Sequence, residues 1–396
     1  MKLAGQKIPV GCSHAVVLPS FDFETYSECP ISYGVSRYTE HPSAEVLCLA
    51  YDLKNGQGPK LWIPGMPAPQ DLFDHIASGG LLEAWNSLFE YFVWLNLCVK
   101  KLGWPPLPLE QTRDVMAKAR AHCLPAALEK CGAAMGADIA KDKDGKRLIR
   151  KFCIPRKPTK KDARTRILLS DDPEDAQKLY DYCVQDVASQ DYLSERIPDL
   201  SPLETRVWLV DQRMNVRGLG VDKPALAACM SIIAQAQEVY TKELVEVTDG
   251  WVDGKDKTAE IIKWAKAAQG FSMASCDKDH VIMYLNMDIP DPLRRVLRIR
   301  QLLTSASIGK MVTISNVMSE DGRIRCLLNY HGARTGRETA GTVQPQNLKA
   351  SGPDVQLCGC GKHYAISLGR CPWCDAVIRR NVVEWSADVV EDVLEI

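Results

Sequence analysis

Four acidic side chains are spaced so that they can converge on divalent cations. Asp22 and Glu24 alternate in an apolar run that reads as a strand, which places both on one face. Glu90 lies in A-W-N-S-L-F-E, and Asp186 ends Y-C-V-Q-D, four residues after Tyr182. Unpaired buried carboxylates are costly, and hard cations such as Mg²⁺ or Mn²⁺ remove that cost. The pattern predicts a site for two such ions.

Each segment by itself has a plainer interpretation. A D-x-E pair is common at the exposed end of a strand, and a tyrosine such as Tyr182 is often a core residue. Tyr182 and Asp186 share one face of a predicted helix, which favours a joint role in the site. The combination of the three segments therefore carries the prediction.

The three segments resemble, in the same order, the Exo I, Exo II and Exo III motifs of DnaQ-like 3′→5′ exonucleases. Glu90 stands where most members of that family carry aspartate. The resemblance implies a ribonuclease H-like fold and phosphodiester hydrolysis with two metal ions. It implies that Asp22, Glu24 and Asp186 hold the first ion, that Glu90 holds the second, and that Tyr182 orients the attacking water.

The elements that would position these residues alternate in an α/β pattern. Ser87 is expected to cap the helix that carries Glu90, and Gly103 to end it. Strands followed by covering helices predict an α/β layered exonuclease domain over residues 1–200. The strands are expected over residues 15–25, 44–53, 60–63 and 81–85, and the helices over 87–101, 111–122, 125–135 and 172–196.

A basic block lies between the second and third motifs. Residues 141–166 contain twelve Lys or Arg and three acids, with several Pro and Gly breaks. We expect an exposed loop that contacts the DNA backbone, although a solvated loop is the simpler interpretation. The residues expected to bind DNA in this domain are Asn86, Lys146, Arg147, Arg156 and Lys157.

The second region is predicted to be mostly helical. Its helices are expected over residues 203–216, 224–247, 257–268, 277–286 and 292–315, with a short strand at 324–330. The segment at 203–222 resembles the joint between exonuclease and polymerase in phage-type family A DNA polymerases. The resemblance implies a partial polymerase thumb region over residues 201–333.

Residues 332–348, G-A-R-T-G-R-E-T-A-G-T-V-Q-P-Q-N-L, resemble the primer–template motif of the same polymerases. The side chains expected to contact the primer–template are Arg334, Thr335, Arg337, Gln346 and Asn347. An ordinary Gly-rich loop is the alternative. The polymerase motifs D-x-x-S-x-I-E and H-D-E do not occur in the chain. We therefore expect no polymerisation by this chain alone, and a second chain carrying palm and fingers is a possible partner.

Four cysteines near the C-terminus form two paired knuckles. Cys358 and Cys360 are separated by ten residues from the pair Cys371 and Cys374. This spacing predicts one structural Zn²⁺ in a small zinc ribbon within residues 334–396, with His363 as a possible substitute ligand. A redox C-x-x-C is the alternative, but no thioredoxin-like strand precedes the pair.

Composition agrees with a protein of the cytoplasm. The chain is 46% hydrophobic and 25% charged, and its fifteen cysteines occur without a signal peptide, so they are expected to be reduced. No apolar run is long enough for a membrane span. The leading prediction is the proofreading exonuclease portion of a bacteriophage family A DNA polymerase, a nucleotidyltransferase of DNA replication, acting on single-stranded 3′ ends. The alternatives are a ribonuclease D-like RNA exonuclease and a non-catalytic DNA-binding subunit.

Overall fold

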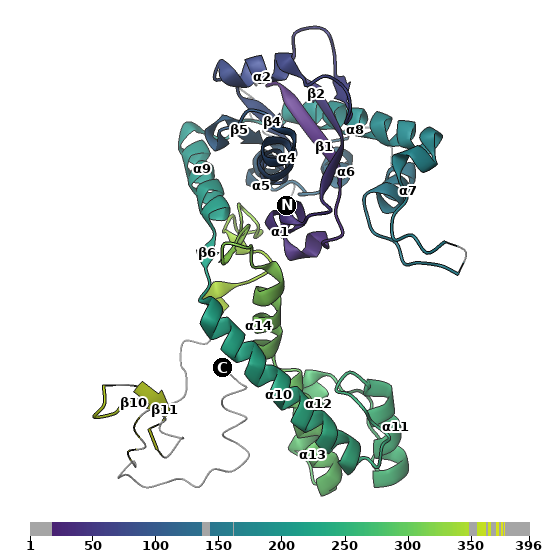
Figure 1. The fold of residues 1–396 in the computed structure, drawn as a ribbon, viewed down its shortest axis with the longest axis vertical. Coiled ribbons are helices and arrows are strands. Elements are labelled where there is room, and N and C mark those ends of the chain that lie inside the picture. Colours follow the sequence, from purple (N-terminus) through teal and green to yellow (C-terminus); the bar gives the residue numbers. More distant parts are fainter. Residues whose placement is uncertain are drawn as a thin grey trace, which may run out of the picture. The chain divides into compact units, whose positions relative to one another are not determined.

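The computed structural model describes residues 18–136, 143–160, 162–347, 355–361, 363–365, 370–371, 374 and 376 (Figure 1). The chain divides into two compact units. The first comprises Met1–Gly220 and Val317–Thr342, and the second comprises Val221–Asn316 and Val343–Ile396. The three domains predicted from sequence motifs, over residues 1–200, 201–333 and 334–396, stay a prediction. No helix of the described residues is long and apolar enough to cross a membrane.

The first unit is built on a mixed five-stranded sheet in the order β3-β2-β1-β4-β5. The central strand pairs antiparallel with β2, which pairs antiparallel with β3, while β4 and β5 continue in parallel. The strands are β1 (Ser20–Tyr26), β2 (Glu45–Asp52), β3 (Lys60–Trp62), β4 (Leu82–Ala84) and β5 (Thr112–Asp114). The four predicted strands are confirmed, except that β1 begins at Ser20 and the predicted residues 15–17 lie outside the described part of the chain. The fifth strand was expected to be the start of a helix, because three residues are too few for a visible alternation.

Helices cover both faces of this sheet. On one face, Phe21 and Phe23 of β1 pack edge-on against Trp94. On the other face, Cys48 and Ala50 of β2 pack against α8. The helices are α1 (Val35–Glu40), α2 (Gln70–Ala77), α3 (Ser87–Val93), α4 (Lys100–Leu102), α5 (Val115–Ala121), α6 (Leu128–Ala134), α7 (Lys143–Phe152), α8 (Pro173–Ser194) and α9 (Pro202–Arg217). The prediction of an α/β layered domain is confirmed.

The helix that follows β4 is continuous but not uniform. It runs through α3, the π-helical η2 (Trp94–Val99) and α4, and it ends at Gly103 in the left-handed region, as expected. The expected cap is wrong: Asn86 is the N-cap, and Ser87 instead donates from its backbone N and its Oγ to Asp114 Oδ2. The Asp114 carboxylate also caps α5 by accepting from the backbone N of Ala117. One carboxylate therefore joins the starts of two helices.

The basic block was predicted to be a loop, and this prediction is wrong for its first part. Residues Lys143–Phe152 form α7. Leu148 and Phe152, one helical turn apart, are buried against Tyr26 and Leu47 of the sheet and Leu179 of α8. Most of the other positions are charged, so two apolar residues four positions apart give too weak a periodicity to predict a helix.

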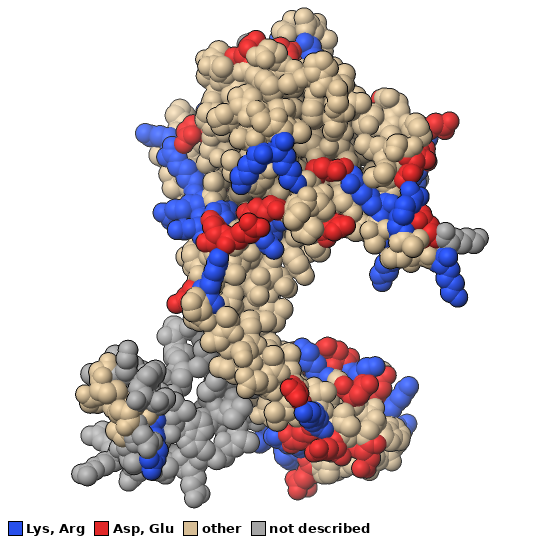
Figure 2. All heavy atoms as spheres, in the orientation of Figure 1, with Lys and Arg blue, Asp and Glu red and all other residues tan. Residues whose placement is uncertain are grey.

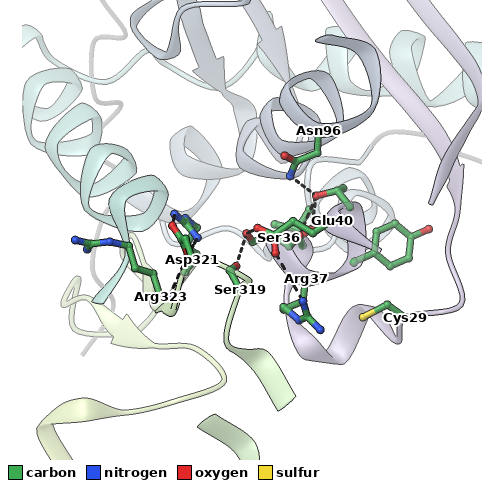
Figure 3. Close-up of polar contacts among 12 residues, drawn as sticks. Cys29, Ser36, Arg37, Glu40, Asn96, Ser319, Asp321 and Arg323 are labelled. Carbon is green, nitrogen blue, oxygen red and sulfur yellow. Dashed lines mark hydrogen bonds and ion pairs between the residues drawn. The ribbon is translucent and has the colours of Figure 1, made fainter. Parts of the chain in front are cut away.

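Residues 317–342 return to the first unit. β6 (Leu219–Gly220) pairs with β7 (Arg323–Ile324), and β8 (Leu328–Asn329) pairs with β9 (Thr339–Ala340). The single strand expected at 324–330 is therefore two short strands, and Cys326 between them has a positive φ of 57°. Ser319 bonds Ser36 of α1 at 3.0 Å between the two Oγ atoms, as Figure 3 shows.

The second unit is a helical bundle around one apolar core. Its helices are α10 (Lys223–Val247), α11 (Thr258–Gln269), α12 (Lys278–Leu285), α13 (Asp291–Leu303) and α14 (Ala306–Val317). Leu244, Trp264 and Leu297 are among its buried residues. The helix predicted over 292–315 is two helices, since the chain breaks at Thr304 and Ser305. Short elements complete the description: β10 (Val355–Leu357), β11 (His363–Ala365), η1 (Ile31–Tyr33), η3 (Leu109–Gln111), η4 (Leu169–Asp171) and η5 (Pro345–Asn347).

Candidate metal centre and nucleic-acid contacts

Three of the predicted carboxylates meet at the packing of β1 against α8. Asp22 and Glu24 lie on the same face of β1, and Asp186 approaches them from α8. The three residues each offer a carboxylate oxygen, and these oxygens lie within 4.8 Å of one another. Residues separated by more than 160 positions in the chain are thus brought together in one cluster, as the motif order predicted.

The electrostatics of this cluster are unfavourable for the bare protein. Burial raises the pKa of Glu24 to about 8, and the nearby Asp186 carboxylate adds to the rise. Burial, followed by the charges of Asp186 and Glu24, also raises the pKa of Asp22 well above its ordinary value. No Lys or Arg contributes to either shift. A divalent cation would supply the missing positive charge.

Glu90 reaches the same region from the first turn of α3. Its side chain is buried, and its Oε2 atom has no hydrogen-bond partner among the described residues. Burial, then the charges of Asp22 and Glu24, raises its pKa, while a hydrogen bond from the Phe23 backbone lowers it. A buried carboxylate oxygen without a partner is rare in proteins, and it fits a missing ligand such as a metal ion.

Tyr182 lies beside this cluster on α8. Its hydroxyl hydrogen-bonds Asp186, and burial followed by the Asp186 charge raises its pKa. The phenol therefore remains protonated and can donate. Gly145 of α7 leaves the space that the ring occupies, because a Cβ at that position would come within 2.5 Å of Tyr182 Cε2. Gly145 was not predicted as a site residue, because a glycine within a charged block gives no sign of contact with Tyr182.

Two cysteines lie directly beneath the carboxylates. Cys153 Sγ is 3.5 Å from Glu24 Oε2, and Cys183 Sγ is 3.6 Å from Asp22 Oδ2. Both thiols are buried, and each donates to the neighbouring carboxylate. From the sequence, both cysteines were predicted to be ordinary core residues. The spacing of Cys183, three residues before Asp186 on one helix, was the available signal.

Some of the residues predicted to bind DNA are already paired with acidic side chains, and others are exposed. Arg147 forms a bidentate ion pair with Asp175, with N–O distances of 2.5 and 2.9 Å, and Arg156 pairs with Asp162. Figure 2 shows acidic and basic side chains intermingled around α7. Lys146 is highly exposed and has a long contact with Glu129, and Lys157 is exposed. Asn86 is exposed at the start of α3.

The primer–template motif is divided between the two units. Arg334, Thr335 and Arg337 belong to the first unit and are exposed. Asn347 belongs to the second unit, where its backbone oxygen accepts from Lys310 Nζ. The backbone of Gln346 lies in η5, but its side chain is outside the described part of the chain. The contacts predicted for these residues stay predictions.

The four C-terminal cysteines are clustered. Their sulfur atoms lie within 4.8 Å of one another, with 3.4 Å between Cys358 and Cys374 and 3.6 Å between Cys360 and Cys371. Four converging sulfurs are a suitable ligand set for a tetrahedral metal. The side chain of His363, the predicted substitute ligand, lies outside the described part of the chain.

Comparison with known proteins relates the chain to DNA polymerases. No family model matches it. The DNA polymerase of Bacillus phage SP02 is 32% identical over 336 residues, which cover 83% of this chain and 51% of the phage protein. A solved structure, the polymerase domain of Pol1 from M. smegmatis in complex with DNA primer-template and dNTP, is similar with a TM-score of 0.43 and 15% identity, over 83% of this chain and 52% of that one.

Over most of its length the chain is similar in sequence to a phage DNA polymerase. The match to the phage enzyme confirms the resemblance found in the sequence, and the chain spans about half the length of this curated relative.

Proposed function

We propose that the first unit is a metal-dependent 3′→5′ exonuclease, the proofreading portion of a phage-type family A DNA polymerase. The observation that carries the proposal is the cluster of Asp22, Glu24 and Asp186, with ligand oxygens within 4.8 Å of one another. Glu90, whose Oε2 has no hydrogen-bond partner among the described residues, adds a fourth carboxylate near Asp22 and Glu24. Positions that match three exonuclease motifs, far apart in the chain, thus lie at one place.

The topology of the sheet supports the same proposal. A central strand with antiparallel neighbours on one side and parallel neighbours on the other fits the ribonuclease H-like fold that the motif resemblance implies. In this arrangement β1 carries two carboxylates, α3 carries the third and α8 the fourth. Each motif is therefore on the type of element that the resemblance requires.

The residues suggest a division of roles. Asp22, Glu24 and Asp186 would hold one divalent cation, and Glu90 would hold a second or its waters. Bound cations would supply charge stabilisation for the scissile phosphate and activate a water. Tyr182, whose hydroxyl donates to Asp186, would orient the attacking water beside that carboxylate. Buried surroundings on both sides of β1 keep these groups in fixed positions.

A structural zinc ion is a second part of the proposal. Cys358, Cys360, Cys371 and Cys374 would hold it, since four converging sulfurs match the ligand set of a structural zinc ion. Mass spectrometry of the native chain should find one Zn²⁺. A chain that binds no Zn²⁺, with disulfides between the two pairs, would refute this part.

The test of the nuclease uses 5′-labelled single-stranded DNA and RNA of one sequence, with Mg²⁺ or Mn²⁺. We expect a ladder that shortens from the 3′ end of DNA and disappears in Asp22→Ala. The matched control is Asp74→Ala, because Asp74 is an exposed carboxylate on α2. The two variants also separate loss of chemistry from loss of folding, since both can be compared by circular dichroism.

Other outcomes would favour other functions. Preferential shortening of RNA would favour a ribonuclease D-like enzyme. An intact substrate under every metal condition would refute the nuclease. If Mn²⁺ titration then also showed no binding that depends on Asp22, a non-catalytic DNA-binding subunit would be the better interpretation.

A further inference from the structure

Two buried thiols lie against the two carboxylates of β1 that are proposed to hold a divalent cation. Cys153 Sγ is 3.5 Å from Glu24 Oε2. Cys183 Sγ is 3.5 Å from the backbone oxygen of Asp22 and 3.6 Å from its Oδ2 atom. The two cysteines are only 7% and 0% exposed. Each carboxylate of β1 therefore has its own thiol donor, and the two donors come from different elements of the fold.

The positions of both sulfur atoms are set by the elements that carry them. Cys183 lies in the middle of α8 and packs with Cys48 and Ala50 of β2. Cys153 directly follows α7, and its backbone nitrogen donates to the backbone oxygen of Ile149 in that helix at 2.8 Å. It belongs to the apolar cluster through which α7 packs on the sheet. Both thiols are thus held in place by helices that pack against the strands.

A thiol in such a position restrains the direction in which its carboxylate points. An ionised carboxylate has about four lone-pair positions, and an S–H group occupies only one of them. The bond from Cys153 to Glu24 therefore restrains the carboxyl plane and leaves the other lone pairs for a cation. Cys183 contacts both the backbone oxygen and Oδ2 of Asp22, so one sulfur atom restrains the side-chain torsion of that residue.

This restraint matters more for Mg²⁺ than for the larger Mn²⁺. Mg²⁺ demands near-ideal octahedral geometry with bonds of about 2.0–2.1 Å, so a misdirected carboxylate weakens its binding most. Loss of a hydrogen bond that orients a metal ligand typically lowers metal affinity by about 10–100-fold. Because a thiol is a weak donor, its loss should have an effect at the lower end of this range.

We propose that Cys153 and Cys183 are positioning residues of the metal centre, which hold Glu24 and Asp22 in the orientation that Mg²⁺ requires. The inference deepens the proposed nuclease and rests on it for the identity of the ions. Each thiol acts through one carboxylate and has no contact of its own with the cation or with DNA in this role.

The plainer interpretation is that both cysteines are small core residues. Cys131 of α6 is such a residue, because it is equally buried and packs with the apolar side chains of Val115 on α5 and Leu193 on α8. It therefore provides a matched control in the same unit of the chain.

The experiment measures cation binding by the full chain in the absence of DNA. Calorimetric titration gives the affinities for Mg²⁺ and Mn²⁺, and Asp22→Ala defines the part of the signal that belongs to this centre. Cys153→Ala and Cys183→Ala remove the donors, whereas Cys153→Ser and Cys183→Ser keep a donor at each position. Cys131→Ala is the control, and urea unfolding in EDTA monitors the fold of every variant.

We expect each of the two alanine variants to weaken Mg²⁺ binding by about tenfold and Mn²⁺ binding by less, so that the ratio of the two affinities changes. The serine variants should retain most of the Mg²⁺ affinity, because a hydroxyl group also donates. Cys131→Ala should leave both affinities unchanged. A purely structural role would lower the urea midpoint without changing the ratio.

Three results would overturn the proposal. They are an unchanged Mg²⁺ affinity in both alanine variants, a loss that is equal for the two ions, and serine variants that bind Mg²⁺ as weakly as the alanine variants. A wild-type chain without cation binding that depends on Asp22 would overturn it as well. Two positions, with two substitutions at each, keep the test decisive if one variant does not fold.

The DNA-shortening assay on the same proteins separates this inference from the nuclease. Cation binding that depends on Cys153 and Cys183, in a chain that leaves DNA intact, would refute only the nuclease. DNA shortening by wild type, together with unchanged Mg²⁺ affinity in both alanine variants, would refute only the positioning role. In a chain that has both properties, the Mg²⁺ concentration for half-maximal rate should rise by the same factor of about ten in the alanine variants.

Discussion

Removing divalent cations should make the stability of the first unit fall as pH rises. Burial and the Asp186 carboxylate raise the pKa of Glu24 from 4.5 in the unfolded chain to about 8 in the folded one. The folded state therefore binds more protons than the unfolded state between these values. The stabilisation is fully present below pH 4.5 and is lost as pH rises through about 8.

The magnitude follows from the two pKa values. A rise from 4.5 to about 8 corresponds to at most roughly 5 kcal/mol of unfolding free energy lost across this window. That is comparable with the whole stability of many domains. A bound cation replaces the proton as the partner of the carboxylate, so the loss should largely disappear when Mg²⁺ or Mn²⁺ is present.

The assay is urea unfolding followed by circular dichroism across this pH window, with EDTA or with Mn²⁺. Glu24→Gln should make the profile in EDTA less steep, because the amide does not titrate, while Asp22 and Glu90, whose pKa values are also raised, keep part of the slope. Glu28→Gln, a change at an exposed acid close in sequence, should preserve it. A flat profile for wild type in EDTA, or an unchanged slope in Glu24→Gln, would show that these carboxylates do not form a buried repulsive cluster.

Three further predictions follow from single contacts. Glu90→Gln should abolish DNA shortening yet raise stability in EDTA by about 1–3 kcal/mol, measured by urea unfolding, because it removes a buried charge with an unpartnered oxygen. Gly145→Ala should slow the nuclease while leaving the unfolding midpoint nearly unchanged, since the added methyl displaces the Tyr182 ring. Asn215→Ala should destabilise the chain by about 2 kcal/mol, because two backbone groups of β8 lose their partner; an unchanged midpoint would contradict this.

The parts of the fold that sequence analysis predicted well depend on local patterns. Asp22 and Glu24 were placed on a strand by alternation, and Tyr182 and Asp186 on a helix by their four-residue spacing, and both placements are confirmed. Their convergence was predicted from motif order and is seen in the cluster of Asp22, Glu24 and Asp186. Periodicity alone contains no information about which elements meet.

The errors arise where tertiary contacts override local signals. The basic block reads as a loop because charge dominates it, yet Leu148 and Phe152 are enough to dock a helix on the sheet. Serine is a common N-cap residue, but Ser87 instead donates a hydrogen bond to Asp114 of β5. On α9 the polar side is buried because Asn215 finds backbone partners in a segment more than 100 residues away, which no local pattern reveals.

Gln190 of α8 has a consequence for the order in which the molecule folds. Its side chain accepts from the backbone N of Trp85 at 2.7 Å and donates to the backbone oxygens of Phe21 and Glu83, so it links α8 to both β1 and β4. Those strands share a single register pair, Ser20 with Glu83, and gain much of their connection from this helix.

A chain leaving the ribosome can form the β1–β2–β3 meander early, but α8 is synthesised more than 100 residues later. Long-range closure is slow in folding, so the carboxylate cluster should assemble after the β1–β2–β3 meander. The growing chain therefore does not bring Asp186 beside Asp22 and Glu24 until the meander that carries these two residues has formed.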